Sequence, residues 1–266
     1  NRGQCHPAEN SSGKSRKEAV MQLPGMITFV ALKTDMTNEH AIFSRNWPIY
    51  QQLVNNNYML HREIGQLTGD WMKRVSSSEG SHILDLGCGD CSEMANILGH
   101  LDYSSYTGID LSEMALKVAQ KNLEELPSVR LLTGPMESVI ETLGENFAII
   151  HSCYAIHHLQ DNAKQELFRA IHKKLAHGGV FILGDIFRNP GQNREHYLKR
   201  YTEMIRKDWG VIKHEDQDLI LEHIHSSDFP ASIDDCKSWL SACGFFVEEG
   251  FEANEQHKLL ILRKHH

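Results

Sequence analysis

Short apolar runs alternate with longer amphipathic segments through the middle of the chain. Five such runs lie at residues 83–86, 106–110, 129–133, 147–152 and 180–185. Their length and apolar content indicate strands that are buried on both faces of a parallel sheet. The segment that begins at Asp161 places Leu167, Phe168, Ile171 and Leu175 at helical spacing, as expected of a helix that packs on this sheet.

Helical spacing also marks the segments that flank this alternating region. Apolar and aromatic positions between residues 47 and 75 predict one or two helices ahead of the first strand. An unusually long segment, 186–242, follows the fifth strand. Tyr197, Tyr201 and Ile205 recur there at intervals of four and predict a helix. Additional helices are therefore predicted both before and after the five strands in the sequence.

The first strand leads directly into a glycine loop. Gly87 and Gly89 follow Leu86, and glycine lets a backbone turn tightly and approach a ligand closely. Ser92 can then cap the helix that begins after the loop. Because a G-x-G sequence arises easily at any turn, the loop alone is weak evidence of a binding site.

A carboxylate at the end of the second strand strengthens the evidence that the glycine loop belongs to a binding site. Asp110 ends the run that follows the loop, where a carboxylate can accept both hydroxyls of an adenosine ribose. A nicotinamide dinucleotide site would be expected to have a third glycine at position 92, and Ser92 stands there. A nucleoside cofactor without phosphates is therefore favoured over a dinucleotide.

The residues of the loop carry a family resemblance. The segment 84–89, Leu-Asp-Leu-Gly-Cys-Gly, resembles the first motif of class I S-adenosylmethionine-dependent methyltransferases. The resemblance continues in the family's order through residues 108–112, 147–152, 155–159 and 175–183. Two positions depart from the family pattern. Cys91 stands where a third loop glycine is usual, and Pro135 and Met136 stand where an acidic residue often lies near the adenine.

The resemblance implies an α/β fold with a doubly wound, mostly parallel seven-stranded sheet, an antiparallel last strand and a helical cap. We expect residues 1–35 to be a disordered tail or an extension and 36–266 to be a single methyltransferase domain. Its expected parts are an N-terminal helical cap at 36–80, a cofactor-binding core at 81–186, a helical substrate lid at 187–242 and final strands at 243–266. A dimerisation surface is the alternative use of the lid.

The resemblance also implies where S-adenosyl-L-methionine binds. Asp110 would hold the ribose, Asp85 would meet the methionyl ammonium directly or through water, and Arg62 could pair with the cofactor's carboxylate. Tyr58 could close the site, or could anchor its helix on the sheet. The full expected set of cofactor-binding residues is Asp85, Gly87, Cys88, Gly89, Asp110, Leu111, Pro135, Met136, Ser152, Tyr58 and Arg62.

Candidate catalytic residues follow the fourth and fifth strands. Ligands of doubly wound sheets bind beyond the carboxyl ends of the strands, where His157 and His158 are expected. A hydroxyl or protonated amine acceptor must lose a proton, and a histidine has a suitable unperturbed pKa. His157 is the first candidate base, His158 the second and Asp185 the third. The alternative is that the histidines only shape the acceptor pocket.

Composition narrows the possible partners. The formal net charge of −8 over 266 residues disfavours nucleic acid, whose binding needs clustered lysines and arginines. No apolar run approaches the roughly 20 residues of a membrane span. Six cysteines suggest free thiols and a cytoplasmic location. Cys88 and Cys91 form a C-x-x-C motif inside the cofactor loop, and no second pair at zinc spacing accompanies them, so no metal is expected.

The sequence therefore predicts an enzyme that transfers a methyl group from S-adenosylmethionine to a small-molecule acceptor through an O-, N- or S-nucleophile. A catalytically silent cofactor-binding regulator is the alternative from a different class. A nicotinamide oxidoreductase is the least favoured. Neither the acceptor nor the oligomeric state can be read from these residues.

Overall fold

The computed structural model describes residues 28–31, 40–77 and 80–265. Within these residues, eight strands form one sheet in the order β1-β4-β3-β2-β5-β6-β8-β7. The strands are β1 (Thr28–Ala31), β2 (His82–Leu86), β3 (Ser105–Asp110), β4 (Val129–Thr133), β5 (Phe147–Cys153), β6 (Leu175–Ile186), β7 (Phe245–Glu252) and β8 (His257–Lys264). The helices are α1 (His40–Asn55), α2 (His61–Val75), α3 (Ser92–Leu98), α4 (Glu113–Asn122), α5 (Met136–Thr142), α6 (Asp161–Lys174), α7 (Arg194–Asp208), α8 (His214–Ser227) and α9 (Ile233–Ala242), with a 3-10 turn η1 (Ile156–His158).

The direction of the strands places a crevice at one edge of the sheet. Strands β1 to β6 pair in parallel, whereas β8 pairs antiparallel with both β6 and β7. The chain order reverses between β2 and β5, because β3 and β4 lie on one side of β2 and β6 lies beyond β5. Ligands of such sheets bind outside the carboxyl ends of the strands at this reversal. The loops after β2, β3, β5 and β6 therefore border the candidate site.

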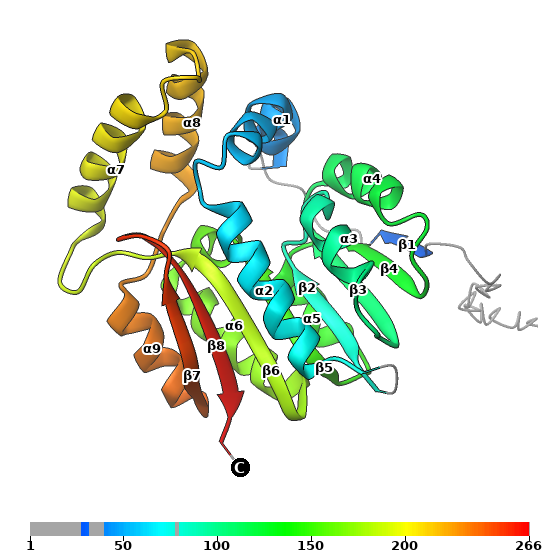
Figure 1. The fold of residues 1–266 in the computed structure, drawn as a ribbon. Helices are drawn as coiled ribbons and strands as arrows, with labels where there is room; N and C mark the ends of the chain where they lie inside the picture. Colours follow the sequence, from blue (N-terminus) through cyan, green and yellow to red (C-terminus); the bar gives the residue numbers. More distant parts are fainter. Residues whose placement is uncertain (1–27, 32–39, 78–79, 266) are drawn as a thin grey trace, which may run out of the picture.

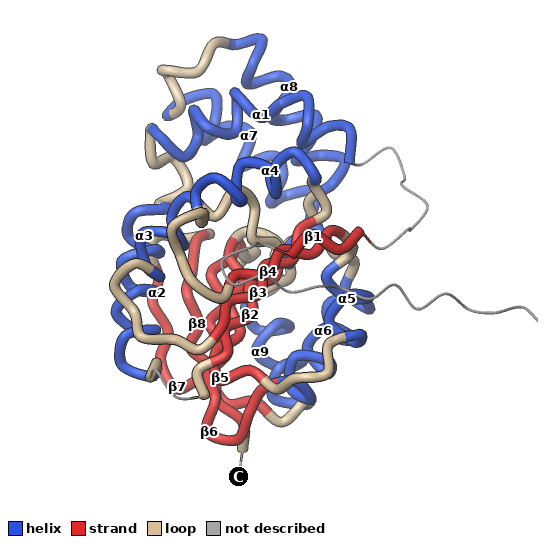
Figure 2. The backbone as a smooth tube through the Cα atoms, turned by 90° about the vertical axis from the view of Figure 1, so that its right-hand side faces the viewer, coloured by secondary structure: helices blue, strands red, loops and turns tan. Residues whose placement is uncertain are grey.

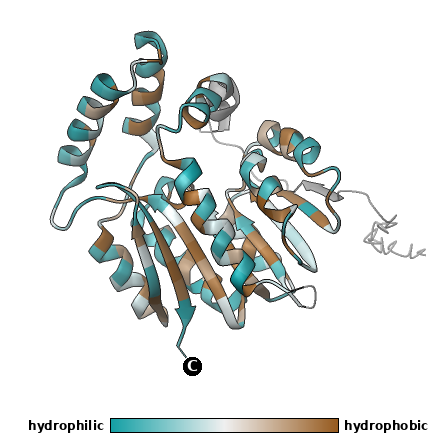
Figure 3. Cartoon of the chain, in the orientation of Figure 1, coloured by the Kyte–Doolittle hydropathy of each residue, from teal (hydrophilic) through white to brown (hydrophobic). Residues whose placement is uncertain are grey.

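Two apolar layers cover the two faces of the sheet. One layer joins α5, α6 and α9 to the sheet through buried side chains such as Val139, Phe168 and Leu240. The other joins α2, α3 and α4 through side chains such as Met72 and Leu98. Figure 2 shows the strands between α2 and α3 on one side and α5, α6 and α9 on the other. Figure 3 shows hydrophobic residues concentrated in the strands between these layers, as burial on both faces requires.

A third apolar cluster lies beyond the carboxyl ends of the strands. It contains residues of α1, α7 and α8, including Leu53, Tyr201 and Ile224, together with Ile186 from the end of β6. In Figure 1 these three helices lie beyond one edge of the sheet. The long segment after the fifth predicted strand therefore folds over the expected ligand site.

The predicted α/β fold is confirmed, including the antiparallel last strand. The edge strand β1 adds to the seven predicted strands and lies inside the expected N-terminal tail. The rest of that tail, 1–27 and 32–35, lies outside the described residues. Strand β6 begins at Leu175, earlier than the predicted run at 180–185. No helix in the described part of the chain has the length and apolar character needed to cross a membrane.

Candidate active site

The glycine loop after β2 is fastened to the neighbouring strand by its own backbone. The N–H groups of Gly87 and Cys88 both donate to the carbonyl of Ile109, at 2.8 and 3.0 Å. Gly87 and Gly89 have φ angles of 74° and 56°, which favour glycine. A Cβ atom on Gly87 would lie 2.2 Å from the Cβ of Ala155, whereas one on Gly89 would meet nothing within 4 Å. The backbone of Gly89 is thus open to a ligand.

Asp110 lies beside this open backbone. Its Oδ2 accepts a hydrogen bond from Gly89 N and its Oδ1 accepts one from Ser112 N, both at 2.8 Å. Each carboxylate oxygen has room for a second hydrogen bond. Burial raises the pKa of Asp110, and the two N–H groups act against this shift. The side chain therefore lies against the glycine loop and Ser112, and it is not among the residues that line the cavity described below.

Cys91 adopts the conformation usual for the glycine that it replaces. Its φ is 54°, in the left-handed region, and it precedes α3 without a side-chain cap. The expectation that Ser92 caps this helix was wrong, because Ser92 is the first helical residue and its N–H donates to Asp90 Oδ1. The thiol of Cys91 is buried and lies 3.3 Å from the hydroxyl of Tyr106. The departure from the family pattern leaves the turn of the loop in place.

A cavity of about 220 Å³ separates the glycine loop from α1 and α2. Three acidic side chains line it, from Asp85, Asp90 and Glu93. Asp85 accepts a hydrogen bond from Tyr106 Oη, and its Oδ1 lies 2.8 Å from Nδ1 of His151. Three carboxyl groups in one cavity favour a ligand that carries positive charge. We call this space the cofactor cavity.

Two side chains in the cofactor cavity have pKa values that burial has shifted. Burial raises the pKa of Glu93 to about 7, and nearby His151 acts against this shift. The absence of a side chain on Gly65 makes room for this carboxyl, since a Cβ there would lie 1.5 Å from Glu93 Oε1. Burial lowers the pKa of His61 to about 4, and neither of its ring nitrogens makes a hydrogen bond. His61 is only 8% exposed, but it lines the cofactor cavity. A ligand in that cavity could therefore bond to its nitrogens.

A second cavity of about 100 Å³ adjoins the first. Its lining is mainly apolar and aromatic and comes from α1, α8, the ends of β5 and β6, and side chains such as Tyr201 and Trp209. Tyr50 and Tyr154 line both cavities. We call the second space the acceptor cavity. The two tyrosines form the boundary between the two spaces.

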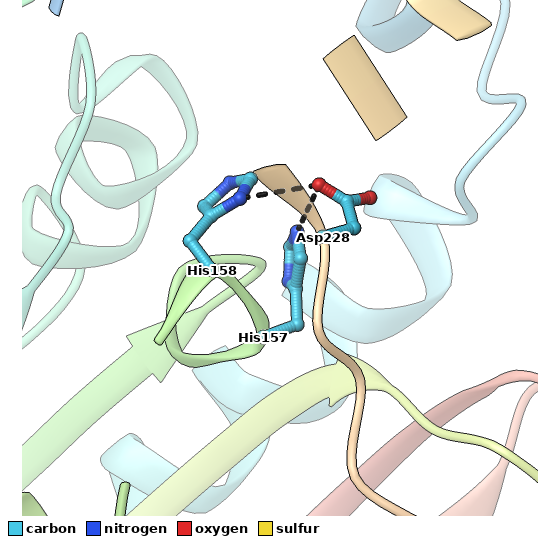
Figure 4. A group of neighbouring side chains, drawn as sticks. All are labelled: His157, His158 and Asp228. Atoms are coloured by element: carbon cyan, nitrogen blue, oxygen red, sulfur yellow. Dashed lines mark ion pairs between the residues drawn. The ribbon is translucent and has the colours of Figure 1, made fainter. Parts of the chain in front are cut away.

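Three histidines and an aspartate gather at one side of the acceptor cavity. Nδ1 of His157 lies 2.6 Å from Asp185 Oδ1, and the backbone N–H of His157 donates to Asp185 Oδ2. His158 and His223 lie beside it, with ring centroids 5.4 Å apart. Both His157 and His158 come from η1 and face Asp228, from the segment after α8 (Figure 4). Burial lowers the pKa of His157, but Asp185 and Asp228 outweigh burial and the net shift is upward.

The remaining residues that were predicted to bind the cofactor differ in their position and in their exposure. Met136 begins α5, and its Cε lies 3.6 Å from the position of a Cβ on Gly87. Ser152 is fully buried and donates to the carbonyl of Leu86, so it joins two strands. Leu111 is exposed at the end of β3. Pro135 precedes α5, and Cys88 lines the cofactor cavity.

Tyr58 and Arg62 lie away from the glycine loop. Tyr58 stacks on Trp209 with ring centroids 5.1 Å apart and accepts a hydrogen bond from Val211 N. Arg62 donates to the carbonyl of Asn55 and lines neither cavity. Tyr58 therefore packs the turn between α1 and α2 against the segment after α7, whereas a place over the cofactor or on the sheet was considered from the sequence.

Several residues of the site had no assigned role in the sequence expectation. They are Glu93, His151, His223 and Asp228. Glu93 follows the glycine loop by a few residues, so its position at the start of α3 was a usable signal. Asp228 carries no local signal, because only the folded lid brings it to His157.

Comparison with known proteins shows which families this chain resembles. A family model described as a methyltransferase domain matches residues 83–179. A ubiquinone biosynthesis O-methyltransferase of Pseudomonas putida is 30% identical over 131 residues, which are 48% of this chain and 54% of the relative. The corresponding protein of Psychrobacter arcticus is 32% identical over 134 residues, 47% of this chain and 49% of the relative. The chain thus spans about half the length of the curated relatives that it matches.

Solved structures agree in fold at low sequence identity. A magnesium protoporphyrin IX methyltransferase of Synechocystis, solved with SAH bound, superposes with a TM-score of 0.60 at 14% identity and covers 84% of this chain and 96% of that chain. An S-adenosylmethionine-dependent methyltransferase of Clostridium acetobutylicum gives a TM-score of 0.57 at 12% identity, with 84% and 98% covered. The chain therefore carries a methyltransferase domain at residues 83–179 and has the fold of class I S-adenosylmethionine-dependent methyltransferases.

Proposed function

We propose that this chain transfers a methyl group from S-adenosyl-L-methionine to a small-molecule acceptor. The observation that carries the proposal is the pair of adjoining cavities that share Tyr50 and Tyr154. One cavity ends on the glycine loop and the other on the histidines after β5. Methyl transfer needs such an arrangement, because donor and acceptor must be held in line at near-attack distance.

The cofactor cavity suits the methionyl part of the donor. Its acidic lining would attract the ammonium and the positive sulfur, with Asp85 and Glu93 the nearest candidates for the ammonium. The ring of His61, whose nitrogens make no hydrogen bond within the protein, could donate one to the methionyl carboxylate. The orphaned nitrogens of His61 and the open space beside Gly89 are two independent features that a bound donor would explain.

The ribose and adenine would lie on the β3 side of the loop. Asp110 has unused acceptor capacity beside Gly89, so we assign it to the ribose hydroxyls. Met136 and Leu111 would border the adenine, and the backbone of Gly87 to Gly89 would run beside the donor. The bound donor supplies an electrophilic methyl group, and the chain's own contribution is to bind and orient it.

The acceptor would occupy the apolar cavity, with its reacting atom near His157 and His158. Asp185 orients His157, since its Oδ1 lies next to Nδ1 and both of its oxygens are engaged within the protein. Asp185 is therefore proposed as a positioning residue. A hydroxyl acceptor must lose its proton, which an imidazole can accept or a bound cation can promote. The names of the curated relatives, O-methyltransferases, favour an oxygen acceptor for this cavity.

We also place the chain in the cytoplasm. All five cysteines in the described part of the chain are free thiols, as is usual in a reducing compartment.

Calorimetry with S-adenosylhomocysteine tests the donor site. The wild-type chain should bind it, and Asp110→Ala should bind at least about tenfold more weakly, because a hydrogen bond to a charged group contributes roughly 1.5–3 kcal/mol. Equal affinity in the two proteins would refute the ribose assignment.

Incubation with S-adenosylmethionine and a panel of phenols, carboxylic acids, amines and thiols tests turnover. We expect S-adenosylhomocysteine to accumulate with at least one acceptor class. Donor binding without product in any class would favour the silent cofactor-binding protein.

A further inference from the structure

The acceptor cavity contains a buried carboxylate that faces several imidazoles. Asp228 is 3% exposed, and burial of a charge is costly unless the charge is paired or coordinates a metal. Three imidazole nitrogens lie near Oδ1 of Asp228, from His158 at 3.2 Å, His157 at 3.8 Å and His223 at 3.9 Å.

We propose that His157, His158 and Asp228 bind one divalent transition-metal cation of the Zn²⁺ type. One nitrogen of each histidine and Oδ1 of Asp228 all lie within 4.8 Å of one another. In Figure 4 both imidazoles face the same oxygen of Asp228. Ligands about 2.0–2.2 Å from a tetrahedral Zn²⁺ lie about 3.4 Å apart, so only a small closing movement of the side chains is required.

Asp185 holds His157 in a form that can bind a metal. Asp185 Oδ1 lies 2.6 Å from Nδ1, and a carboxylate can only accept, so the proton of the neutral ring is on Nδ1. The lone pair of Nε2 then faces Asp228. A histidine ligand whose other nitrogen donates to a carboxylate is a usual arrangement around protein-bound zinc. Asp185 would therefore orient the ligand without touching the metal.

The donor set selects the class of cation. Two imidazoles and one carboxylate suit Zn²⁺, Fe²⁺ or Co²⁺, whereas Mg²⁺ prefers oxygen ligands and water. Three protein ligands leave at least one coordination position, and all three residues line the acceptor cavity. A cation there could bind an acceptor hydroxyl and lower its pKa. That role depends on the proposed function, but cation binding does not.

His158 also offers a test of the competing explanation, a simple ion-pair cluster. Its Nδ1 lies 3.2 Å from the carbonyl of Ser227 as well as from Asp228, so His158 has partners within the protein even without a metal. In that case the cluster would have no affinity for a cation beyond that of the surface histidines. Metal titration therefore separates the two explanations.

The test is a titration of the untagged full-length chain with CoCl₂, followed by the visible absorption of Co²⁺. We expect one Co²⁺ per chain, displaced by Zn²⁺ and not by an equal excess of Mg²⁺. Asp228→Asn and His158→Gln should each weaken binding by at least about 100-fold, and Asp185→Asn by about 10- to 100-fold. His214→Ala removes an exposed histidine outside the cluster and should bind as the wild type does.

Absence of saturable Co²⁺ binding by the wild type would overturn the proposal. Equal binding by wild type, Asp228→Asn and His158→Gln would also overturn it, because the ion would then be adventitious on other histidines. Should Asp228→Asn fail to fold, His158→Gln still decides, since this side chain is 27% exposed. The titration needs no methyl donor or acceptor, so a failure of the proposed methyl transfer would leave its result unchanged.

Discussion

The pH dependence of donor binding should depend on Glu93. Burial raises the pKa of this carboxyl to about 7 from its ordinary 4.5. Below about pH 7 the side chain is therefore mostly protonated in the free protein. A ligand that brings an ammonium into the cofactor cavity favours the ionised carboxylate, so binding must release the proton.

The size of the effect follows from the two pKa values. If the bound donor returns the pKa of Glu93 to its ordinary 4.5, affinity falls by up to about tenfold for each pH unit below about 7. Between about pH 7 and pH 5 the loss would reach roughly 40-fold, because Glu93 is already half protonated at pH 7. The pKa of His61, which burial lowers to about 4, lies below this window. A free α-amino group titrates near 7.7–8.0, so the donor keeps its ammonium throughout.

Calorimetry with S-adenosylhomocysteine measures this dependence directly. Titrations in buffers of different ionisation enthalpy should show close to one proton released near pH 6 and fewer near pH 8. Glu93→Gln cannot ionise, so its affinity should vary much less over the same range. A wild-type affinity that is flat between about pH 5 and 7, or an equal slope in Glu93→Gln, would refute the assignment of Glu93 to the donor's ammonium.

Three further substitutions test other parts of the site. His157→Gln should lower turnover by about 10²- to 10⁴-fold with unchanged affinity for S-adenosylhomocysteine; an equal rate would exclude it from catalysis. Gly87→Ala should lower the free energy of unfolding in urea by about 1–3 kcal/mol, because its φ is 74° and a Cβ there would clash. Gly144→Ala, where a Cβ meets nothing within 4 Å, is the matched control, and an equal loss in both would contradict the clash. Tyr106→Phe should cost about 1–3 kcal/mol, since Asp85 loses a donor in a buried place; unchanged stability would show that water replaces it.

The core of the fold was predictable because its strands are buried on both faces. Such strands need continuous apolar runs, and the predicted strand at 129–133 coincides with β4. The edge strand β1 was missed because it pairs with β4 alone and carries little local pattern. Gly178 and Gly179 lie within β6 although the predicted run began only at residue 180, and a Cβ on Gly179 would be 2.9 Å from the carbonyl of Ala148.

The sequence allowed prediction of site residues that directly follow strands, but not of those that lie in the helical segment after β6. Asp110 and the glycine loop are adjacent because parallel strands end at one edge of the sheet. Asp228 reaches His157 only after α7 and α8 have folded back over the crevice, and no local pattern records that contact. Tyr58 was open to two roles because an aromatic residue on a helix can face either a ligand or a neighbouring ring.

Tyr50 and Tyr154 form a partition between the cofactor cavity and the acceptor cavity, and this partition should couple the binding of the two ligands. Because each ring borders both spaces, a rotation that makes room for one molecule alters the room left for the other. The acceptor's affinity should then change when the donor is present, and linkage requires the donor's affinity to change by the same factor when the acceptor is present. Tyr154 also donates to the carbonyl of Met59, just before α2, so the partition is tied to the helices that cover the crevice. Methylated product and demethylated cofactor would therefore leave as coupled events.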